Sequence, residues 1–396
     1  MMVSMIELLQ AVLNTYEISG SVVGEAVVGN STVYRVLRHP ENGGTSLSKC
    51  ANEIALHLGV ESIKIEKLPE HNAYGIVTPY RCTESVDAAD IIESPELKGA
   101  KSCLSFALGK DAFSNTIIGD LSLMPHLLVG GGADFGKSVF LDQIILSLLH
   151  KCTPDEVSLI LISPNSNKML SYNGVPHLAH PAISDPRDAL RALGFLNKLI
   201  AERFNSFDVL AKFLSGAIKN DRSMRSRYNS GDVKNISDYN AVAYGDDRAR
   251  MPYVVVVIDE LSELNGVLGS KAENPILKLG TKARAAGIHL VLATSEIDNT
   301  TITDAIKTVC PSRVAFKVSD ANSSRVILDR SGAENLLGGG DMLYQHGFSI
   351  RPKRIQGAYI SGEAVVRSVK SAISSHLSSD DRLGMSGFMS EVNNSG

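Results

Sequence analysis

The sequence predicts an α/β protein in which a parallel central sheet, covered by helices on both faces, follows a smaller α+β domain. Beyond about residue 105, five apolar strand-like runs alternate with helical stretches, a pattern typical of parallel sheets. A glycine-rich turn joins the first of these runs to an apolar helix. Before residue 105, short β-like runs broken by Gly and Asn follow an amphipathic stretch. We expect domains at residues 1–105 and 106–372, then a disordered Ser-, Asn- and Asp-rich tail at 373–396.

The elements of the smaller domain are predicted from the spacing of apolar residues. Helical spacing predicts helices at residues 5–13 and 53–58. Short β-like runs predict strands at residues 21–28, 32–37, 62–65 and 75–77. Residues 95–101 are expected to form a polar connector.

The larger domain is expected to contain five buried strands, at residues 126–129, 157–162, 253–258, 288–293 and 313–318. The long segment between the second and third strands predicts a helix over residues 186–207. A polar, basic stretch then covers residues 212–234.

Composition excludes several classes of protein. The 396 residues are 44% apolar and 21% charged, so collagen-like and wholly disordered chains are excluded. No run approaches the ~20 consecutive apolar residues of a membrane span, and the N-terminus does not resemble a signal peptide, so a cytoplasmic location is expected. The formal net charge of −4 is not that of a passive nucleic-acid coat, so any contact with nucleic acid is expected to be local.

The cysteines and histidines give no signal for a disulfide framework or a metal site. The cysteines are odd in number and never spaced as C-x-x-C, which predicts reduced, mostly buried thiols. No pair of histidines has H-x-x-x-H spacing, and His126, His177 and His289 are expected to pack in the core. No G-x-S-x-G elbow indicates a serine nucleophile.

A phosphate-binding loop follows the first predicted strand. Residues 131–138 fit the pattern G-x-x-x-x-G-K-[ST], and an apolar helix follows. In this pattern backbone N–H groups surround a β-phosphate, Lys137 reaches the β- and γ-phosphates, and the Ser138 hydroxyl binds Mg²⁺. The predicted nucleotide-binding residues are Gly131, Gly132, Ala133, Asp134, Phe135, Gly136, Lys137, Ser138 and Val139. The Asp134 carboxylate would repel phosphates if it faced them and would be harmless if it pointed outward.

A Walker B pattern completes the predicted site. The buried strand at residues 253–258 ends in Asp259 and Glu260. In a parallel sheet the end of this strand lies beside the phosphate loop, so Asp259 is expected to hold Mg²⁺ and Glu260 to polarise the attacking water. The alternative is an ordinary acidic start to a helix. Together the two motifs predict a Mg-dependent ATPase.

Residues 282–294 of the larger domain read KARAAGIHLVLAT. In this stretch most strongly, the larger domain resembles the motor region of the FtsK/SpoIIIE family of double-stranded DNA translocases. It extends over about residues 6–370, through Gly136-Lys137-Ser138-Val139, Gly174-Val175-Pro176-His177-Leu178 and Gly340-Asp341-Met342-Leu343-Tyr344. The first hundred residues are more weakly similar to the α domain that precedes the RecA-like β domain of this family.

The resemblance implies a RecA-like P-loop ATPase that uses ATP and Mg²⁺. It also implies a homohexameric ring that threads double-stranded DNA and has its ATP sites between subunits. The membrane-spanning region and the winged-helix γ domain of the family have no counterpart in the sequence. DNA transfer or packaging by a mobile element or virus is therefore a candidate process.

The sequence departs from the family pattern close to the predicted ATP site. The family's T-G-S-G-K-S is Ala133-Asp134-Phe135-Gly136-Lys137-Ser138 here, and its Asp-Pro-Lys is Ser163-Pro164-Asn165. Ser295 replaces a Gln that would sense the γ-phosphate, and the shorter side chain needs a water to bridge the gap. These changes bear on rate and coupling more than on nucleotide binding.

A ring ATPase needs a cation from the neighbouring subunit to neutralise charge on the γ-phosphate. Arg284 is the first candidate for this arginine finger, with Arg203 and Arg313 as alternatives. Each could instead be a surface or helix-terminal arginine.

The basic stretch at residues 212–234 is a candidate contact for duplex DNA through counterion release. Its cations are Lys212, Lys219, Arg222, Arg225, Arg227 and Lys234. A solvated loop that also carries aspartates is an equally good interpretation.

Two other functions remain open from the sequence. The first is a nucleotide-binding structural or regulatory subunit with a degenerate motor, which Asp134, Ser163 and Ser295 suggest. The second is a protein-secretion ATPase of the same superfamily.

Overall fold

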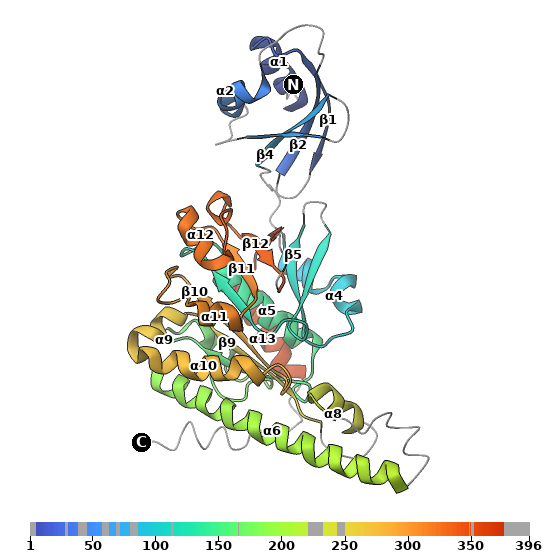
Figure 1. Ribbon diagram of the computed structural model, residues 1–396, viewed down its shortest axis with the longest axis vertical. Coiled ribbons are helices and arrows are strands. Elements are labelled where there is room, and N and C mark those ends of the chain that lie inside the picture. The colour runs from blue at the N-terminus through green and yellow to red at the C-terminus, as the bar shows by residue number, and fades with distance from the viewer. Residues whose placement is uncertain are drawn as a thin grey trace. The chain divides into compact units, whose positions relative to one another are not determined.

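A computed structural model of the chain describes most of its residues (Figure 1). The described residues are 5–27, 31–38, 46–57, 63–68, 72–79, 86–111, 115–164, 166–220, 233–243, 250–347, 349 and 352–375. The chain divides into two compact units. The first is Met1–Ser85 with Lys110–Asn115 and Arg354–Gln356, and the second is Val86–Gly109, Thr116–Lys353 and Gly357–Gly396.

The first unit contains an antiparallel sheet with the strand order β1-β2-β4-β3. Its elements are α1 (Met5–Thr15), β1 (Gly20–Val27), β2 (Ser31–Arg38), η2 (Leu47–Cys50), α2 (Ala51–His57), β3 (Lys64–Lys67) and β4 (Ala73–Pro79). Leu9 and Leu13 of α1 and Ile54 of α2 pack with Val36 and Ile76 of the sheet in one apolar core. The predicted α+β character of this region is confirmed, with element ends shifted by a few residues.

The larger sheet has the strand order β6-β5-β13-β12-β11-β7-β10-β9-β8. Its strands are β5 (Ser105–Lys110), β6 (Thr116–Asp120), β7 (Leu127–Gly130), β8 (Val157–Ile162), β9 (Tyr253–Ile258), β10 (Ile288–Thr294), β11 (Ser312–Phe316), β12 (Asp341–Gln345) and β13 (Lys353–Gln356). The five predicted strands, β7 to β11, form one parallel block. The sequence did not predict the antiparallel extension that begins with β12 beside β11. Several of its strands are short and partly polar, as in Lys353–Gln356, so they lack the apolar run that marks a buried strand.

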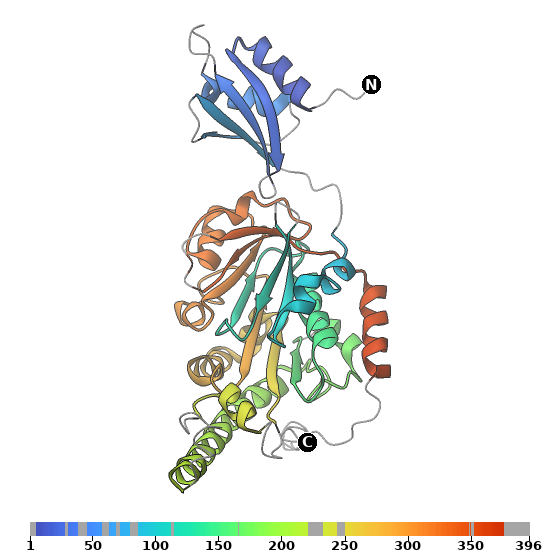
Figure 2. The same cartoon turned by 90° about the vertical axis from the view of Figure 1, so that its right-hand side faces the viewer.

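Helices cover both faces of the parallel block, as predicted (Figure 2). One group is α6 (Pro186–Asn220), α9 (Leu261–Leu268), α10 (Ser270–Lys282) and α11 (Asp304–Val309), and the other is α3 (Ala88–Ile92), α5 (Lys137–Lys151) and α13 (Gly362–Ser375). The remaining elements are α4 (Pro95–Gly99), η3 (Lys168–Tyr172), α8 (Ile236–Ala243), α12 (Ala321–Leu328) and η4 (Ala333–Asn335). Val254, Val256 and Ile258 of β9 pack in one core with Leu193 of α6 and Leu279 of α10. This core fixes the strand ends from which the site is built.

Residues 86–109 group with the second unit, whereas the sequence places the domain boundary near residue 105. The Lys151 ammonium at the end of α5 donates to the carbonyl oxygens of Leu97 (2.8 Å) and Ala100 (2.7 Å). These bonds tie the segment to α5 of the second unit. The expectation of a polar connector at residues 95–101 was wrong for its first part, because Ser94 caps the short helix α4 and Pro95 begins it.

Helix α6 extends well past the predicted end at residue 207. Phe207, Leu210 and Leu214 continue its buried stripe and pack against Ile236. Lys212 therefore lies on a helix and is exposed. Helix α13 covers the first residues of the predicted tail, and residues 376–396 lie outside the described part of the chain.

The described cysteines are free, and Cys50, Cys152 and Cys310 are buried, as expected. His126, His177 and His289 are buried, which confirms their predicted packing in the core. Within the described ranges, no helix combines the length and the apolar character needed to cross a membrane.

Candidate nucleotide site

The phosphate loop lies between β7 and α5, at the carboxyl end of the parallel block. Gly136 forms the N-cap of α5 in the left-handed region, with φ 117°. A Cβ atom at this position would lie 3.0 Å from Cα of Gly340, so both the backbone angle and the space favour glycine. The carbonyl oxygen of Phe135 accepts from the N–H of Gly340 (3.2 Å), which ties the loop to the segment before β12.

Lys137 is buried at the base of the loop. Its ammonium donates to the carbonyl oxygens of Gly131 (2.8 Å) and Gly132 (2.7 Å), which holds the charge within the curve of the loop. Burial lowers the pKa of Lys137, and the carboxylates of Glu260 and Asp259 oppose that shift. The basic group of the first motif and the acidic pair of the second therefore share one electrostatic environment.

Asp134 and Phe135, the residues of the loop that depart from the family pattern, differ in exposure. Asp134 is exposed and has a left-handed backbone, with φ 61°. Phe135 is half-buried and its ring lies beside the backbone of Gly132 and Gly338, with the Lys317 ammonium 6.0 Å from the ring centroid. Phe135 thus packs the phosphate loop against the segment around Gly338 that precedes β12.

The register of the sheet brings the acidic pair to the same edge as the loop. Thr294 of β10 pairs with Gly130 of β7, and Leu292 pairs with Ile258 of β9. Asp259 and Glu260 therefore follow a strand that is separated from the phosphate loop by β10 alone. The strand order therefore places the loop and the acidic pair at the same edge of the sheet, where the charges of Asp259 and Glu260 act on Lys137.

Asp259 is buried and has two polar neighbours that the sequence had not assigned to it. The Ser163 hydroxyl donates to its Oδ2 (3.1 Å), and the Lys168 ammonium lies 3.8 Å from the same atom. Ser163 stands where the family pattern has an aspartate. Here it contributes a hydrogen bond instead of a second negative charge.

Glu260 accepts a dense set of hydrogen bonds. The Ser295 N–H donates to Oε1 (2.9 Å) and Oε2 (3.0 Å), the Ser295 hydroxyl donates to Oε2 (2.6 Å), and the Ser262 hydroxyl donates to Oε1 (2.9 Å). Burial opposes ionisation of Glu260, but the hydrogen bonds from Ser295, Thr294 and Ser262 outweigh it and lower the pKa. From the sequence, Ser295 is expected to reach a γ-phosphate through a water. Within the chain, the hydroxyl of Ser295 donates directly to Glu260.

Asp142 is a further acidic group near the site that the sequence reasoning missed. It lies one helical turn after Ser138 on α5 and accepts from the Tyr172 hydroxyl (2.7 Å). Burial, and then the negative charge of Asp259, raise the pKa of Asp142 to about 6. The four-residue spacing from Ser138, which puts both on one face of α5, was the available signal.

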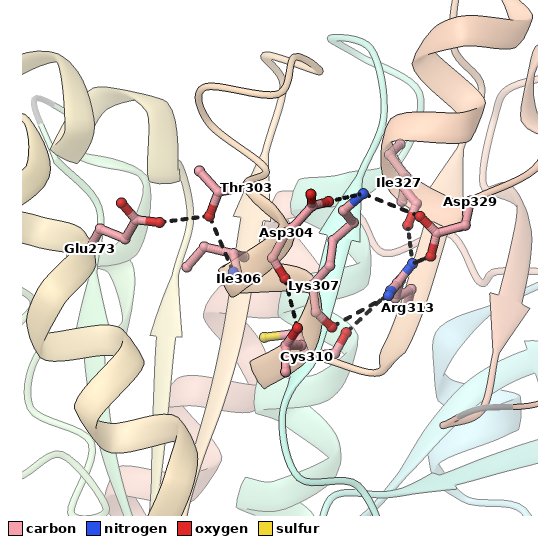
Figure 3. A network of polar contacts seen from close by, with 10 residues as sticks. Glu273, Thr303, Asp304, Ile306, Lys307, Cys310, Arg313, Ile327 and Asp329 are labelled. Atoms are coloured by element: carbon pink, nitrogen blue, oxygen red, sulfur yellow. Dashed lines mark hydrogen bonds and ion pairs between the residues drawn. The ribbon is translucent and has the colours of Figure 1, made fainter.

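The three candidate arginines occupy different environments. Arg203 is buried in α6 and donates to the carbonyl oxygens of Ala286 (2.6 Å) and Pro252 (2.7 Å). Arg313 is also buried and joins the ends of α11 and α12 through the carbonyl oxygens of Cys310 and Ile327 and the carboxylate of Asp329 (Figure 3). Both side chains hold the fold together, so neither is oriented to reach another subunit.

Arg284 is exposed and lies at the opposite edge of the sheet from the phosphate loop. It precedes β10, whose seven residues span roughly 23 Å at ~3.3 Å each. Its Nε donates to the Ser122 carbonyl oxygen (3.2 Å), and its side chain lines a cavity of about 760 Å³ together with Lys101, Arg250 and Glu156. Arg284 is therefore too far away to serve the nucleotide site of its own chain.

A difference in stability should separate these arginines. Replacing Arg203 by Ala leaves one buried and one part-buried carbonyl oxygen without their donor, so we expect a loss of about 2–4 kcal/mol in the free energy of unfolding. Arg284→Ala, at an exposed position, should cost no more than ~0.5 kcal/mol. Urea unfolding measures both, and equal losses would contradict the structural assignment of Arg203.

Residues 221–232 of the basic stretch at residues 212–234 lie outside the described residues. Lys212 is exposed on α6, and the N–H of Lys234 donates to Asp238 Oδ2 (3.0 Å) before α8. Arg222, Arg225 and Arg227 are not described.

The strand order, the register and the phosphate loop define a P-loop NTPase domain of the RecA-like type, preceded by a smaller α+β unit. Residues 88–299 match the FtsK/SpoIIIE family. The chain belongs to this family.

Curated relatives extend the match over most of the chain. The sequence is 37% identical over 374 residues to "DNA translocase FtsK" of Clostridium acetobutylicum, covering 93% of this chain and 46% of that protein. It is 40% identical over 334 residues to "DNA translocase FtsK" of Lactiplantibacillus plantarum, covering 83% of this chain and 40% of that protein. The chain thus spans less than half the length of these relatives.

Solved structures with the same fold are more distant in sequence. The conjugation coupling protein TcpA of pCW3, in its monomer form with ATPγS, has a TM-score of 0.62 at 19% identity, with 92% of this chain and 98% of that chain covered. The cytoplasmic domain of the type VII secretion ATPase EccC of Thermomonospora curvata has a TM-score of 0.54 at 21% identity, with 72% and 32% covered. At these identities the likeness concerns the fold.

Proposed function

We propose that this protein hydrolyses ATP with Mg²⁺ and uses the energy to move double-stranded DNA through a homohexameric ring in the cytoplasm. The observation that carries the proposal is the convergence of Lys137 with Asp259 and Glu260 at one edge of the sheet. The names of the relatives, which are DNA translocases, support DNA as the substrate. In this proposal the first unit is the counterpart of the family's α domain.

The residues at the sheet edge fit a magnesium nucleotide. Ser138 offers an exposed hydroxyl and Asp259 a carboxylate, and oxygen ligands of these types suit Mg²⁺. Lys168 already lies 3.8 Å from Asp259, so this carboxylate attracts positive charge. When bound, Mg²⁺ would neutralise charge on the phosphates.

Each residue has a separate part in the proposed chemistry. The Lys137 ammonium exchanges its two loop carbonyls for phosphate oxygens and stabilises their negative charge. The backbone N–H groups of the loop and the N-terminus of α5 hold the phosphates in position. Glu260, ionised because of its hydrogen bonds, orients a water and takes its proton as the water attacks the γ-phosphorus. The bond from this phosphorus to the β–γ bridging oxygen breaks, and ADP leaves.

Arg284 is proposed to act on the nucleotide of a neighbouring subunit. Its exposure and its place at the opposite sheet edge support this role, because a trans finger must lie on a surface away from its own loop. The positive side chains of Lys101 and Arg250 in the same cavity suit the approach of a neighbour's phosphates.

Mixing two inactive variants tests the trans role. Arg284→Ala and Lys137→Ala should each be inactive alone, yet equal mixing should restore about a quarter of the sites, because one subunit supplies the loop and its neighbour the arginine. ATP turnover of the mixture is the measurement. Lys137→Ala mixed with Glu260→Gln is the control and should stay inactive, since both residues serve the same chain's site. Failure of the first mixture to recover, with mixed rings present, would contradict the trans assignment.

Duplex DNA should stimulate ATP hydrolysis by this protein. Binding to a duplex of random sequence should weaken as salt rises from about 50 to 200 mM, because phosphate contacts release counterions. A gel-shift at both salt concentrations, with ATPase assays alongside, checks both effects. Slow turnover that DNA leaves unchanged would favour the nucleotide-binding regulatory subunit.

A protein substrate is a second candidate, because the fold is similar to that of the secretion ATPase EccC. Stimulation of ATP hydrolysis by a peptide but not by DNA would favour this candidate.

A further inference from the structure

Both oxygens of the Glu260 carboxylate accept hydrogen bonds from this chain's own donors. A carboxylate has about four lone-pair sites, two on each oxygen. Oε1 accepts from the Ser295 N–H and the Ser262 hydroxyl, and Oε2 accepts from the Ser295 N–H and the Ser295 hydroxyl. Three donors therefore engage the carboxylate, and the Ser295 N–H is shared between its two oxygens, so we infer that the base must loosen one of these bonds before it accepts a proton from water.

The Ser295 hydroxyl is the donor best placed to release Glu260 in response to nucleotide. Ser295 follows Thr294, which pairs with Gly130 at the start of the phosphate loop, so it stands between the loop and the acidic pair. Its backbone N–H, directly after β10, has its direction set by the main chain, whereas its hydroxyl can rotate about one bond. Ser262, by contrast, lies in the first turn of α9, which follows Glu260 itself.

We propose that Ser295 is a positioning residue whose hydroxyl holds Glu260 in a resting orientation, and that hydrolysis requires this hydroxyl to turn away. A γ-phosphate oxygen is the competing acceptor that would draw the hydroxyl from Glu260. Ser295 thereby couples occupancy of the loop to release of the base. The inference rests on the proposed function, because it assumes that Glu260 is the base.

Removing the hydroxyl tests the proposal. Ser295→Ala keeps the backbone N–H bonds but frees one site on Oε2, so kcat for ATP without DNA should rise by about tenfold, the value of one hydrogen bond to a charged group. Affinity for a fluorescent ADP analogue, which lacks the γ-phosphate, should not change, and the unfolding temperature should fall slightly because Glu260 loses one hydrogen bond. Ser295→Thr keeps a hydroxyl and should restore the low basal rate.

Further outcomes separate this inference from the proposed function. A basal kcat that is unchanged or lower in Ser295→Ala, with nucleotide affinity intact, would overturn the resting role while leaving the ATPase standing. Equal acceleration in Ser295→Thr would also overturn it, because the hydroxyl would then not be the cause. Adding Glu260→Gln to Ser295→Ala should abolish the gain. Persistence of turnover in Glu260→Gln alone would instead remove the proposed function on which the inference rests.

Discussion

Lys137→Ala should reduce ATP hydrolysis by at least ~100-fold, with and without DNA. The ammonium is the one cation held within the phosphate loop in the described part of the chain, and its donors to Gly131 and Gly132 are those that a phosphate would take over. Alanine removes that charge and leaves no side chain able to replace it. Steady-state phosphate release, measured with saturating ATP and MgCl₂, checks the prediction.

A matched variant distinguishes the loop lysine from lysine in general. Lys98 is exposed on α4 and pairs with Glu93 at the surface, so Lys98→Ala should keep the full rate. If Lys137→Ala folded normally and retained turnover, the assignment of the phosphate loop would be wrong.

Glu260→Gln should lower kcat by about 10²–10⁴-fold while leaving nucleotide binding intact. Glutamine has the shape of glutamate but cannot take a proton, so the loop and Asp259 still hold the nucleotide. A fluorescent ATP analogue should bind with unchanged affinity while phosphate release is lost. Asp259→Asn is the comparison, because it should weaken binding in a manner that depends on Mg²⁺ concentration.

The split between binding and turnover is the critical result for Glu260. Equal loss of binding and turnover would give Glu260 a structural role through Ser295 and Ser262. Unchanged turnover would transfer the role of base to another acid, and Asp142 would be the first to test.

The parallel block and the place of the candidate nucleotide site within it could be predicted because both leave strong local patterns. Strands buried on both faces read as unbroken apolar runs, as in residues 253–258, and the loop motif fixes its own strand and helix. The meeting of Lys137 with Asp259 then follows from the topology, since the carboxyl ends of parallel strands share an edge.

The contacts that adjust the site could not be predicted, because they join residues far apart in sequence. The bond from Ser163 to Asp259 and the bonds from Ser295 to Glu260 depend on the strand register, which a single sequence does not give. Ser163 and Ser295, which depart from the family pattern in sequence, are hydrogen-bond partners of Asp259 and Glu260 in the fold. Antiparallel strands such as β13 are too short and polar to be recognised.

Displacement of a triplex-forming strand from linear duplex DNA tests the account most directly, since it reports movement rather than binding. We expect displacement with ATP and Mg²⁺, none with a non-hydrolysable ATP analogue, and none with Lys137→Ala. Duplex DNA that is bound and stimulates ATP hydrolysis, yet never loses its third strand, would contradict the translocase.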